Sequence, residues 1–380
     1  MNEIITLIMK PIATSCNLRC SYCYHRASRE KKLNRMSIGI LRRLIQGCST
    51  LPQGKIRFIW HGGEPLSAGI DFYKQVFKLQ KHFLKDKKVI NTMQTNATLI
   101  TEGWRDFFKE NFPHGVGISL DGPEYIHDLY RRYSSDKGTF NKVLDGINLL
   151  KQAGIKIGIL AVVTKQSVKY PKEIFAFLLS LGLQLSGLQF NPCVEYGKDG
   201  RVTDYSLSPE EYSRFMIEIF DLWMKTGNPR IKIKSLYNML EWFIMGRQPS
   251  LCMYKRDCSN YICVGPDGSV YHCGRFFQNS EFKIGDLRSE SLTRIVNSKN
   301  RIRISNLISS IKKECVSCRW LNFCNGGEPC HRYNAGGSLS SPYYFCEATK
   351  QTLEYIEKAV SGSGLILKPS NNEVKEWSLN

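Results

Sequence analysis

The sequence predicts an α/β fold built on parallel strands, followed by a second, cysteine-rich domain. Two observations lead to this prediction. Apolar segments typical of strands alternate with segments of helical periodicity. The alternation stops near residue 230, and nine of the fourteen cysteines follow between Cys252 and Cys346. Strands that alternate with helices are joined by right-handed crossovers, so they form a barrel or an open doubly wound sheet.

The expected elements follow one another along the first 230 residues. The strand candidates, which are short apolar segments, are 4–9, 56–60, 89–93, 115–120, 155–163 and 185–190. The helical candidates, each with an apolar stripe, are 38–47, 72–83, 101–109, 140–152, 171–181 and 209–224. We expect domains at 1–230 and 251–360, a bridging segment at 231–250 and a C-terminal tail at 361–380.

Composition narrows the class of protein. With 380 residues and 42% hydrophobic content, the chain can bury a large core. It shows no signal peptide and no apolar run near the ~20 residues that a membrane span needs, so we expect a cytoplasmic protein without membrane contact. The net charge of +19 is spread in short basic groups with no nucleic-acid motif, which favours solvated faces over nucleic-acid binding. In a reducing compartment, cysteines hold metal or do chemistry more often than they pair.

Three cysteines, Cys16, Cys20 and Cys23, form a C-x3-C-x2-C run directly after the first expected strand. Parallel barrels place their chemistry in the loops at the carboxyl ends of the strands. A closed structural metal site takes four protein ligands, whereas a catalytic site leaves one position open. The run therefore indicates an open metal site, with a zinc loop or chance cysteines as the alternative.

The cysteine run, with Tyr22 before its last cysteine, resembles the signature of the radical S-adenosylmethionine (radical SAM) superfamily. The resemblance implies a partial (β/α)6 TIM-type barrel. It also implies a four-iron cluster on Cys16, Cys20 and Cys23, whose open iron binds S-adenosylmethionine and whose electron cleaves that cofactor to a 5′-deoxyadenosyl radical.

Polar residues at successive strand ends support the resemblance. Gly62-Gly63-Glu64-Pro65 follows the second strand and matches the GGEP motif, which in the superfamily contacts the amine of the cofactor. An ordinary turn, a loop cap or a surface ion pair is the alternative for these residues. The residues that the resemblance assigns to cofactor binding are Tyr22, Gly62, Gly63, Glu64, Pro65, Asn96, Ser119, Asp121 and Arg131.

The C-terminal cysteines resemble the SPASM extension of radical enzymes that modify peptides and proteins. The resemblance implies two auxiliary four-iron clusters, the first on Cys252, Cys258 and Cys273 and the second on Cys315, Cys318, Cys324 and Cys346. The usual C-x3-C step would place a cysteine at position 328, where this chain has Glu328, so Cys330 or Glu328 is left as the fourth ligand of the first cluster. Cys263 has no assigned role, and a pair of zinc sites is the alternative.

The whole resemblance is closest to anaerobic sulfatase-maturase-like proteins, which oxidise Cys or Ser to formylglycine. That family has an aspartate as base directly after the cysteine that matches Cys273, and this chain has Gly274, which cannot take a proton. The leading prediction is therefore a crosslink of the C–C (cyclophane) or thioether type in a ribosomally made peptide. The alternatives are a sulfatase maturase with another base and, in a different class, a non-enzymatic zinc or nucleic-acid binder.

The predicted reaction needs a base and two partners. The base candidates by sequence are His272, His61, Asp121 and Glu195. The partners implied by the resemblance are a precursor peptide as substrate and a reducing protein such as flavodoxin or ferredoxin.

Overall fold

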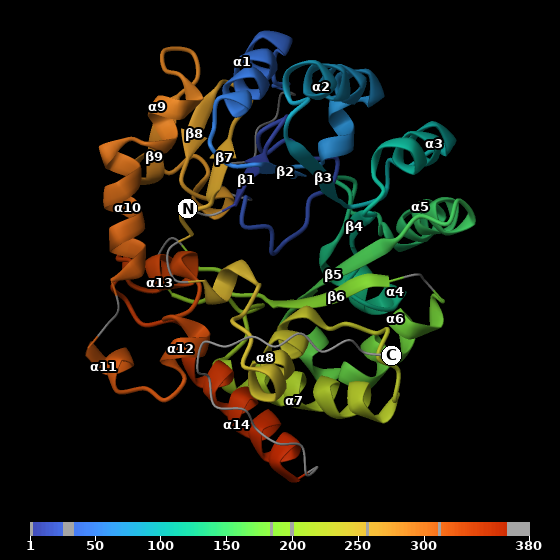
Figure 1. Ribbon diagram of the computed structural model, residues 1–380. Coiled ribbons are helices and arrows are strands. Elements are labelled where there is room, and N and C mark those ends of the chain that lie inside the picture. The colour runs from blue at the N-terminus through green and yellow to red at the C-terminus, as the bar shows by residue number, and fades with distance from the viewer. Residues whose placement is uncertain are drawn as a thin grey trace. The chain divides into compact units, whose positions relative to one another are not determined.

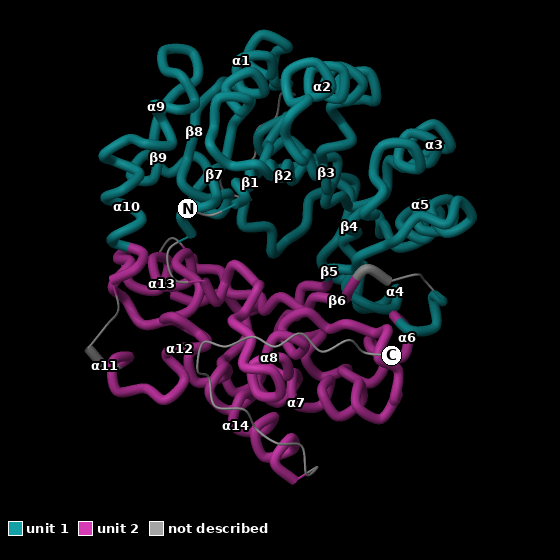
Figure 2. Tube along the Cα trace, viewed as in Figure 1, with its two compact units in different colours: residues 1–160, 179–186, 258–307 teal, residues 161–178, 187–257, 308–380 magenta. Residues whose placement is uncertain are grey.

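The computed structural model describes residues 3–25, 34–182, 185–197, 201–255, 258–310 and 313–362. The chain divides into two compact units, and neither is continuous in sequence (Figure 2). The first comprises residues 1–160, 179–186 and 258–307, and the second comprises 161–178, 187–257 and 308–380. Within the described ranges, no helix has the length and apolar character needed to cross a membrane. The predicted tail lies outside the described residues from 363 onward.

One sheet organises the first unit and extends into the second. Its strands lie in the order β6-β5-β4-β3-β2-β1-β7-β8-β9. From β1 to β5 neighbouring strands are parallel, β1 is also parallel to β7, and the β7-β8-β9 strands are antiparallel. The bounds are β1 Ile4–Met9, β2 Lys55–Trp60, β3 Lys88–Thr95, β4 Val116–Ser119, β5 Ile157–Val163, β6 Leu185–Pro192, β7 Tyr261–Val264, β8 Ser269–Tyr271 and β9 Lys283–Asp286. The predicted parallel partial barrel is confirmed.

Helices of the first unit follow the strands in the expected alternation. Figure 1 shows α1, α2, α3 and α5 in succession along the outer side of the strands β1 to β4. The short helix α4, which the sequence patterns did not predict, follows β4. The bounds are α1 Ile38–Ser49, α2 Ile70–Phe83, α3 Glu102–Asn111, α4 Glu124–Tyr130, α5 Phe140–Gln152, α9 Leu292–Val296 and α10 Lys299–Ser309.

An aromatic cluster fixes the end of β2, from which the loop with Glu64 starts. Alternate residues of β2 are buried, and Trp60 packs edge-on against Tyr73 of α2 at 5.2 Å between ring centroids. The indole Nε1 donates to Asn91 Oδ1 at 2.9 Å, so the one polar atom of this large side chain has a partner. Burial of these rings stabilises the strand end and fixes where the following loop begins.

The second unit is mainly helical. Its longest helices, α7 and α14, pack together, and the hydroxyl of Tyr355 donates to the Asp221 carboxylate at 2.8 and 2.9 Å. Helix α7 begins with a capping box formed by Ser208 and Glu211. The predicted bridge at 231–250 contains the helix α8. The bounds are α6 Pro171–Ser180, α7 Pro209–Lys225, α8 Lys234–Met245, α11 Lys313–Val316, α12 Leu321–Cys324, α13 Pro329–Gly336 and α14 Cys346–Gly362.

Candidate active site and metal centres

The loop with Cys16, Cys20 and Cys23 follows β1, as predicted, and all three thiols are half-buried. Backbone hydrogen bonds fix the loop to the segment after α4. The Arg19 N–H donates to the Arg132 carbonyl at 2.7 Å. The Leu18 N–H turns inward and donates to Cys16 Sγ at 3.3 Å, which is the backbone donation that a thiolate ligand receives in many iron–sulfur sites.

A buried triad holds the middle of this loop. The Tyr22 hydroxyl donates to Asp121 Oδ2 at 2.5 Å, and Arg131 Nε donates to the same oxygen at 2.9 Å. The Arg131 guanidinium also lies 5.4 Å from the centroid of the Tyr22 ring. A carboxylate this deeply buried needs its cation, because an unpaired buried charge is costly. Residues predicted as separate cofactor contacts are therefore brought together, and they tie the cysteine loop to the end of β4.

The Gly62-Gly63-Glu64 turn packs directly onto the cysteine loop. A Cβ atom at Gly63 would lie 1.5 Å from the Ser15 carbonyl oxygen, so only glycine fits. The Glu64 N–H donates to that same carbonyl at 2.9 Å. The glycines thus permit a close backbone approach between this turn and the loop that carries Cys16, Cys20 and Cys23.

The Glu64 carboxylate is fully buried and accepts three hydrogen bonds from the fold itself. Its donors are the Thr95 hydroxyl at 2.7 Å, the Asn96 N–H at 2.7 Å and the Leu66 N–H at 3.0 Å. Burial raises the pKa of this carboxyl to about 7, and the hydrogen bonds oppose the shift. Glu64 therefore joins the turns after β2 and β3, whatever it contributes to cofactor binding.

Asn96, at the end of β3, completes the polar surroundings of Cys16. Its Nδ2 donates to Asn17 Oδ1 at 2.9 Å and lies 3.8 Å from Cys16 Sγ. The predicted residue Ser119, at the end of β4, accepts from Gln94 Nε2 at 3.0 Å. Three thiols on one loop, amide donors beside them and a glycine cradle fit a three-thiolate cluster with one open iron.

A buried Lys10–His25 pair lies at the far end of the same loop, and the sequence analysis did not single it out. Lys10 Nζ is 2.7 Å from His25 Nε2 and lies over the ring of Phe277 at 5.2 Å. Burial lowers the pKa of Lys10 to about 8, while the thiols Cys263, Cys23 and Cys273 oppose the shift. The sequence feature that could have identified this pair is a lysine at the carboxyl end of a barrel strand, where such barrels place their functional residues.

Gly274 stands where the resemblance places the maturase aspartate, and the side chain of Ile8 lies against it. Gly274 begins a short 3-10 turn, η4 Gly274–Phe276. A Cβ atom there would lie 2.9 Å from Ile8 Cγ2 and 3.2 Å from Ile8 Cδ1. Ile8 packs against an apolar cluster of Ala13, Cys263, Tyr271 and Phe277. The chain therefore lacks the carboxylate, and Ile8 crowds the place where a Cβ atom at this position would lie.

The structure places the four predicted base candidates in different environments. His61 Nδ1 accepts from the Gly62 N–H at 2.6 Å, and burial lowers the pKa of His61 to about 3, so the neutral ring carries its proton on Nε2. The Asp121 carboxylate is taken by Tyr22 and Arg131, as described above. His272 is fully buried in the first unit, and Glu195 is half-buried in the second.

The C-terminal cysteines fall into both units. Cys258 and Cys273 belong to the first unit, and Cys252 and Cys330 belong to the second. The four cysteines predicted for the second auxiliary cluster all lie in the second unit. The charges of Cys346, Cys318 and Cys315 act on Cys324, whose pKa burial raises to about 11, so the four thiols lie near one another. Four thiol donors are the ligand set of a four-iron cluster.

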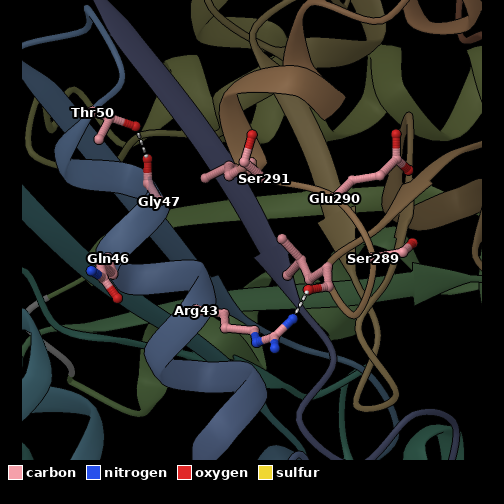
Figure 3. A pocket seen from close by; sticks show the side chains of 9 residues that line it. Arg43, Gln46, Gly47, Thr50, Ser289, Glu290 and Ser291 are labelled. Carbon is pink, nitrogen blue, oxygen red and sulfur yellow. Dashed lines mark hydrogen bonds between the residues drawn. The ribbon is translucent and has the colours of Figure 1, made fainter.

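A surface pocket of about 420 Å³ lies between α1 and the segment before α9 (Figure 3). Arg43 of α1 reaches into it, and its guanidinium already donates to the Leu287 carbonyl at 3.1 Å. Thr50 pairs with Thr293 at 2.8 Å. None of the predicted site residues lines this pocket, and these contacts hold α9 on α1.

Two family models match the chain. Residues 11–178 match the radical SAM superfamily, and residues 252–319 match an iron–sulfur cluster-binding domain, SPASM. These ranges contain the cysteine loop and most of the C-terminal cysteines. The predicted fold class, a partial barrel with a SPASM domain, is confirmed by these matches.

Similar proteins cover nearly the whole chain. A serine-type anaerobic sulfatase-maturating enzyme of Bacteroides thetaiotaomicron is 32% identical over 92% of this chain and 89% of its own length. A cysteine-type enzyme of Clostridium perfringens is 31% identical over 92% of this chain and 96% of its own. The solved structure of anSMEcpe with bound AdoMet and Cp18Cys peptide matches with a TM-score of 0.85 and 29% identity, covering 95% of this chain and 98% of that one.

Proposed function

Because this chain belongs to the radical SAM enzymes that carry a SPASM domain, closely related to the anaerobic sulfatase-maturating enzymes, we propose that it oxidises a Cys or Ser residue of a peptide or protein to formylglycine. The observation that carries the proposal is the three-cysteine loop held beside Asn96, in a chain that matches both maturase types over nine-tenths of its length. Crosslinking, which the sequence patterns favoured, becomes the second candidate. Membership of this enzyme family excludes the non-enzymatic binder.

The proposed oxidation removes two hydrogens from the substrate side chain. When bound, the cluster of Cys16, Cys20 and Cys23 and S-adenosylmethionine supply a 5′-deoxyadenosyl radical. The side chain would lose a hydrogen atom, a proton and an electron, and the cysteines of the SPASM domain would hold the iron–sulfur cluster that takes up the electron. Serine gives the aldehyde directly. Cysteine gives a thioaldehyde, which water converts to the aldehyde with release of hydrogen sulfide.

The residues of the chain have separate tasks in this proposal. The Tyr22–Asp121–Arg131 triad holds the cysteine loop in place, the Glu64 carboxylate joins the turns after β2 and β3, and Asn96 supplies an amide donor beside Cys16. The buried Lys10–His25 pair lies near enough to Cys23 and Cys273 for the charges of both thiols to act on Lys10. We therefore assign this pair to the neighbourhood of the reacting side chain.

The test compares matched peptides that differ at one residue. Anaerobic, reconstituted enzyme receives dithionite, S-adenosylmethionine and a peptide with a C-x-P-x-R-type motif that carries Cys, Ser or Ala at the first position. We expect the Cys or the Ser peptide to become reactive toward a hydrazide probe, together with deoxyadenosine formation, while the Ala peptide stays unchanged. Deoxyadenosine without any aldehyde across these peptides would contradict formylglycine formation.

The second candidate is a carbon–carbon or thioether crosslink in a ribosomally made peptide. Gly274 favours it, because the chain lacks the carboxylate there and Ile8 crowds the place where a Cβ atom would lie. A crosslink also removes two hydrogens, but the product does not react with hydrazide, and its fragments between the linked residues are missing in tandem mass spectra. Both readouts come from the same incubation, so the two candidates separate in one experiment.

A further inference from the structure

Three different metal-binding side chains meet in the second unit. The carboxylate of Glu328, the thiol of Cys330 and the imidazole of His331 have ligand atoms that all lie within 4.8 Å of one another. Cys330 Sγ donates to Glu328 Oε1 at 3.0 Å, and His331 Nδ1 lies 3.4 Å from Glu328 Oε2. Cys330 and His331 are buried, and Glu328 is half-buried.

The local sequence fixes this arrangement rigidly. Pro329 occupies the first turn of α13, and Glu328 is its N-cap residue, so Cys330 and His331 project from the same turn. Gly327 has a φ of +74°, and a Cβ atom there would lie 2.2 Å from the Tyr343 ring. The His331 ring stacks on Tyr343 with an interplanar angle of 6°. Tyr343 therefore clamps the loop before α13 and the imidazole that follows it.

The arrangement differs from the SPASM pattern in its chemistry. That pattern expects one cysteine at position 328, and this chain presents an oxygen donor there and a thiol two residues later. Mixed oxygen, sulfur and nitrogen donors suit iron and zinc. Replacing a thiolate by a nitrogen ligand raises the reduction potential of an iron–sulfur cluster, and the number of anionic sulfur ligands controls the cluster's net charge.

We propose that Glu328 and Cys330 together bind one iron of an auxiliary cluster in place of the expected cysteine, with Cys330 as the thiolate ligand and Glu328 as an oxygen ligand. His331 holds the Glu328 carboxylate in position, as residues behind a metal ligand commonly do. An oxygen ligand on this iron gives it a harder, more exchangeable environment than a single cysteine thiolate would. The inference rests on the family's iron–sulfur chemistry and is independent of the residue that the enzyme oxidises.

The test isolates the auxiliary clusters by using the full chain with Cys16, Cys20 and Cys23 replaced by Ala. In that background, anaerobically reconstituted variants are compared by iron and sulfide content and by the electron paramagnetic resonance spectrum after reduction. We expect Cys330→Ala to lose up to about four irons, and Glu328→Cys combined with Cys330→Ala to regain them. Glu328→Gln keeps the iron but changes the spectrum. Cys48→Ala, which removes a buried thiol of α1, is the matched control with unchanged iron and spectrum.

Two results would overturn the inference. The first is that the Cys330→Ala variant and the Glu328→Gln variant each keep the iron content and the spectrum of the background protein. The other is about one zinc per chain that Cys330→Ala releases while the iron stays constant. A Cys330→Ala variant that fails to fold leaves the Glu328→Gln spectrum as the deciding measurement. None of these readouts depends on peptide oxidation, so failure of the proposed function and failure of this inference are distinguishable.

Discussion

Placing an aspartate at position 274 tests whether the side chain of Ile8 takes the space that a side chain at 274 would need. Gly274→Asp alone brings its Cβ to 2.9 Å from Ile8 Cγ2, a contact that requires Ile8 to move. Such overpacking costs about 1–3 kcal/mol. Ile8→Ala alone opens a void, and since Ile8 is only partly buried we expect about 1–2 kcal/mol, below the usual range for a core Ile→Ala change.

The double variant should be more stable than the summed losses of the two single variants would predict. In Ile8→Ala/Gly274→Asp the new side chain enters the space that the isoleucine leaves, so we expect a favourable coupling of about 1–2 kcal/mol. For a unit of this size that corresponds to a melting temperature about 2–8 °C above the additive value. The thermal unfolding of the metal-free, reduced chain measures it.

The same variants report on chemistry. A positioned base contributes about 10²–10⁴-fold, so the double variant should form aldehyde faster than Ile8→Ala alone if formylglycine formation is limited by proton removal. Strictly additive melting temperatures would refute the claim that Ile8 fills the position. Restored packing without any gain in aldehyde would show that a carboxylate at 274 is not what the reaction lacks.

Three further predictions concern the site. Cys20→Ala should abolish deoxyadenosine formation, measured by mass spectrometry, while Cys48→Ala leaves it intact. In the metal-free chain the Glu64 carboxyl has a pKa of about 7 against an ordinary value of 4.5, so the folded state holds this proton more tightly than the unfolded state does. The free energy of unfolding should therefore fall by about 3 kcal/mol as the pH rises from 4.5 to above 7. Urea titrations at several pH values measure this slope, and Glu64→Gln should remove it. Lys10→Met should lower peptide oxidation at least tenfold but keep deoxyadenosine formation without peptide; equal losses of both would mean that Lys10 only supports the fold.

The sequence predicted the barrel well because its periodicities are long and regular. Helix Phe140–Gln152 and strand Ile4–Met9 were predicted with their observed bounds. Helix α4 was missed because its seven residues make only about two turns, which is too short for a periodic pattern to be recognised. The cysteine loop and its glycine turn were found because spacing alone identifies them.

Contacts between distant segments could not be predicted from the sequence. Nothing in the spacing showed that Arg131 donates to Asp121, or that Ile8 packs where residue 274 would carry a side chain. The Lys10–His25 contact joins a strand end to a loop fifteen residues later, and only the folded chain brings them to 2.7 Å. Residue types and spacing predict donors, whereas pairing depends on tertiary packing.

The two departures from the maturase pattern concern the same part of the proposed reaction. Both Gly274 and Glu328 stand at positions that the SPASM resemblance places beside or among the ligands of the first auxiliary cluster, whereas the three-cysteine loop and the GGEP turn keep the radical SAM pattern. Radical formation needs only the three-cysteine loop and the GGEP turn. In the proposed reaction, loss of the electron and the proton from the substrate depends on the surroundings of Gly274 and Glu328. We therefore expect this enzyme to take its hydrogen atom as its relatives do and to differ in how the substrate radical is oxidised, which is why the variants at 274 and 328 are more informative than further changes around Cys16.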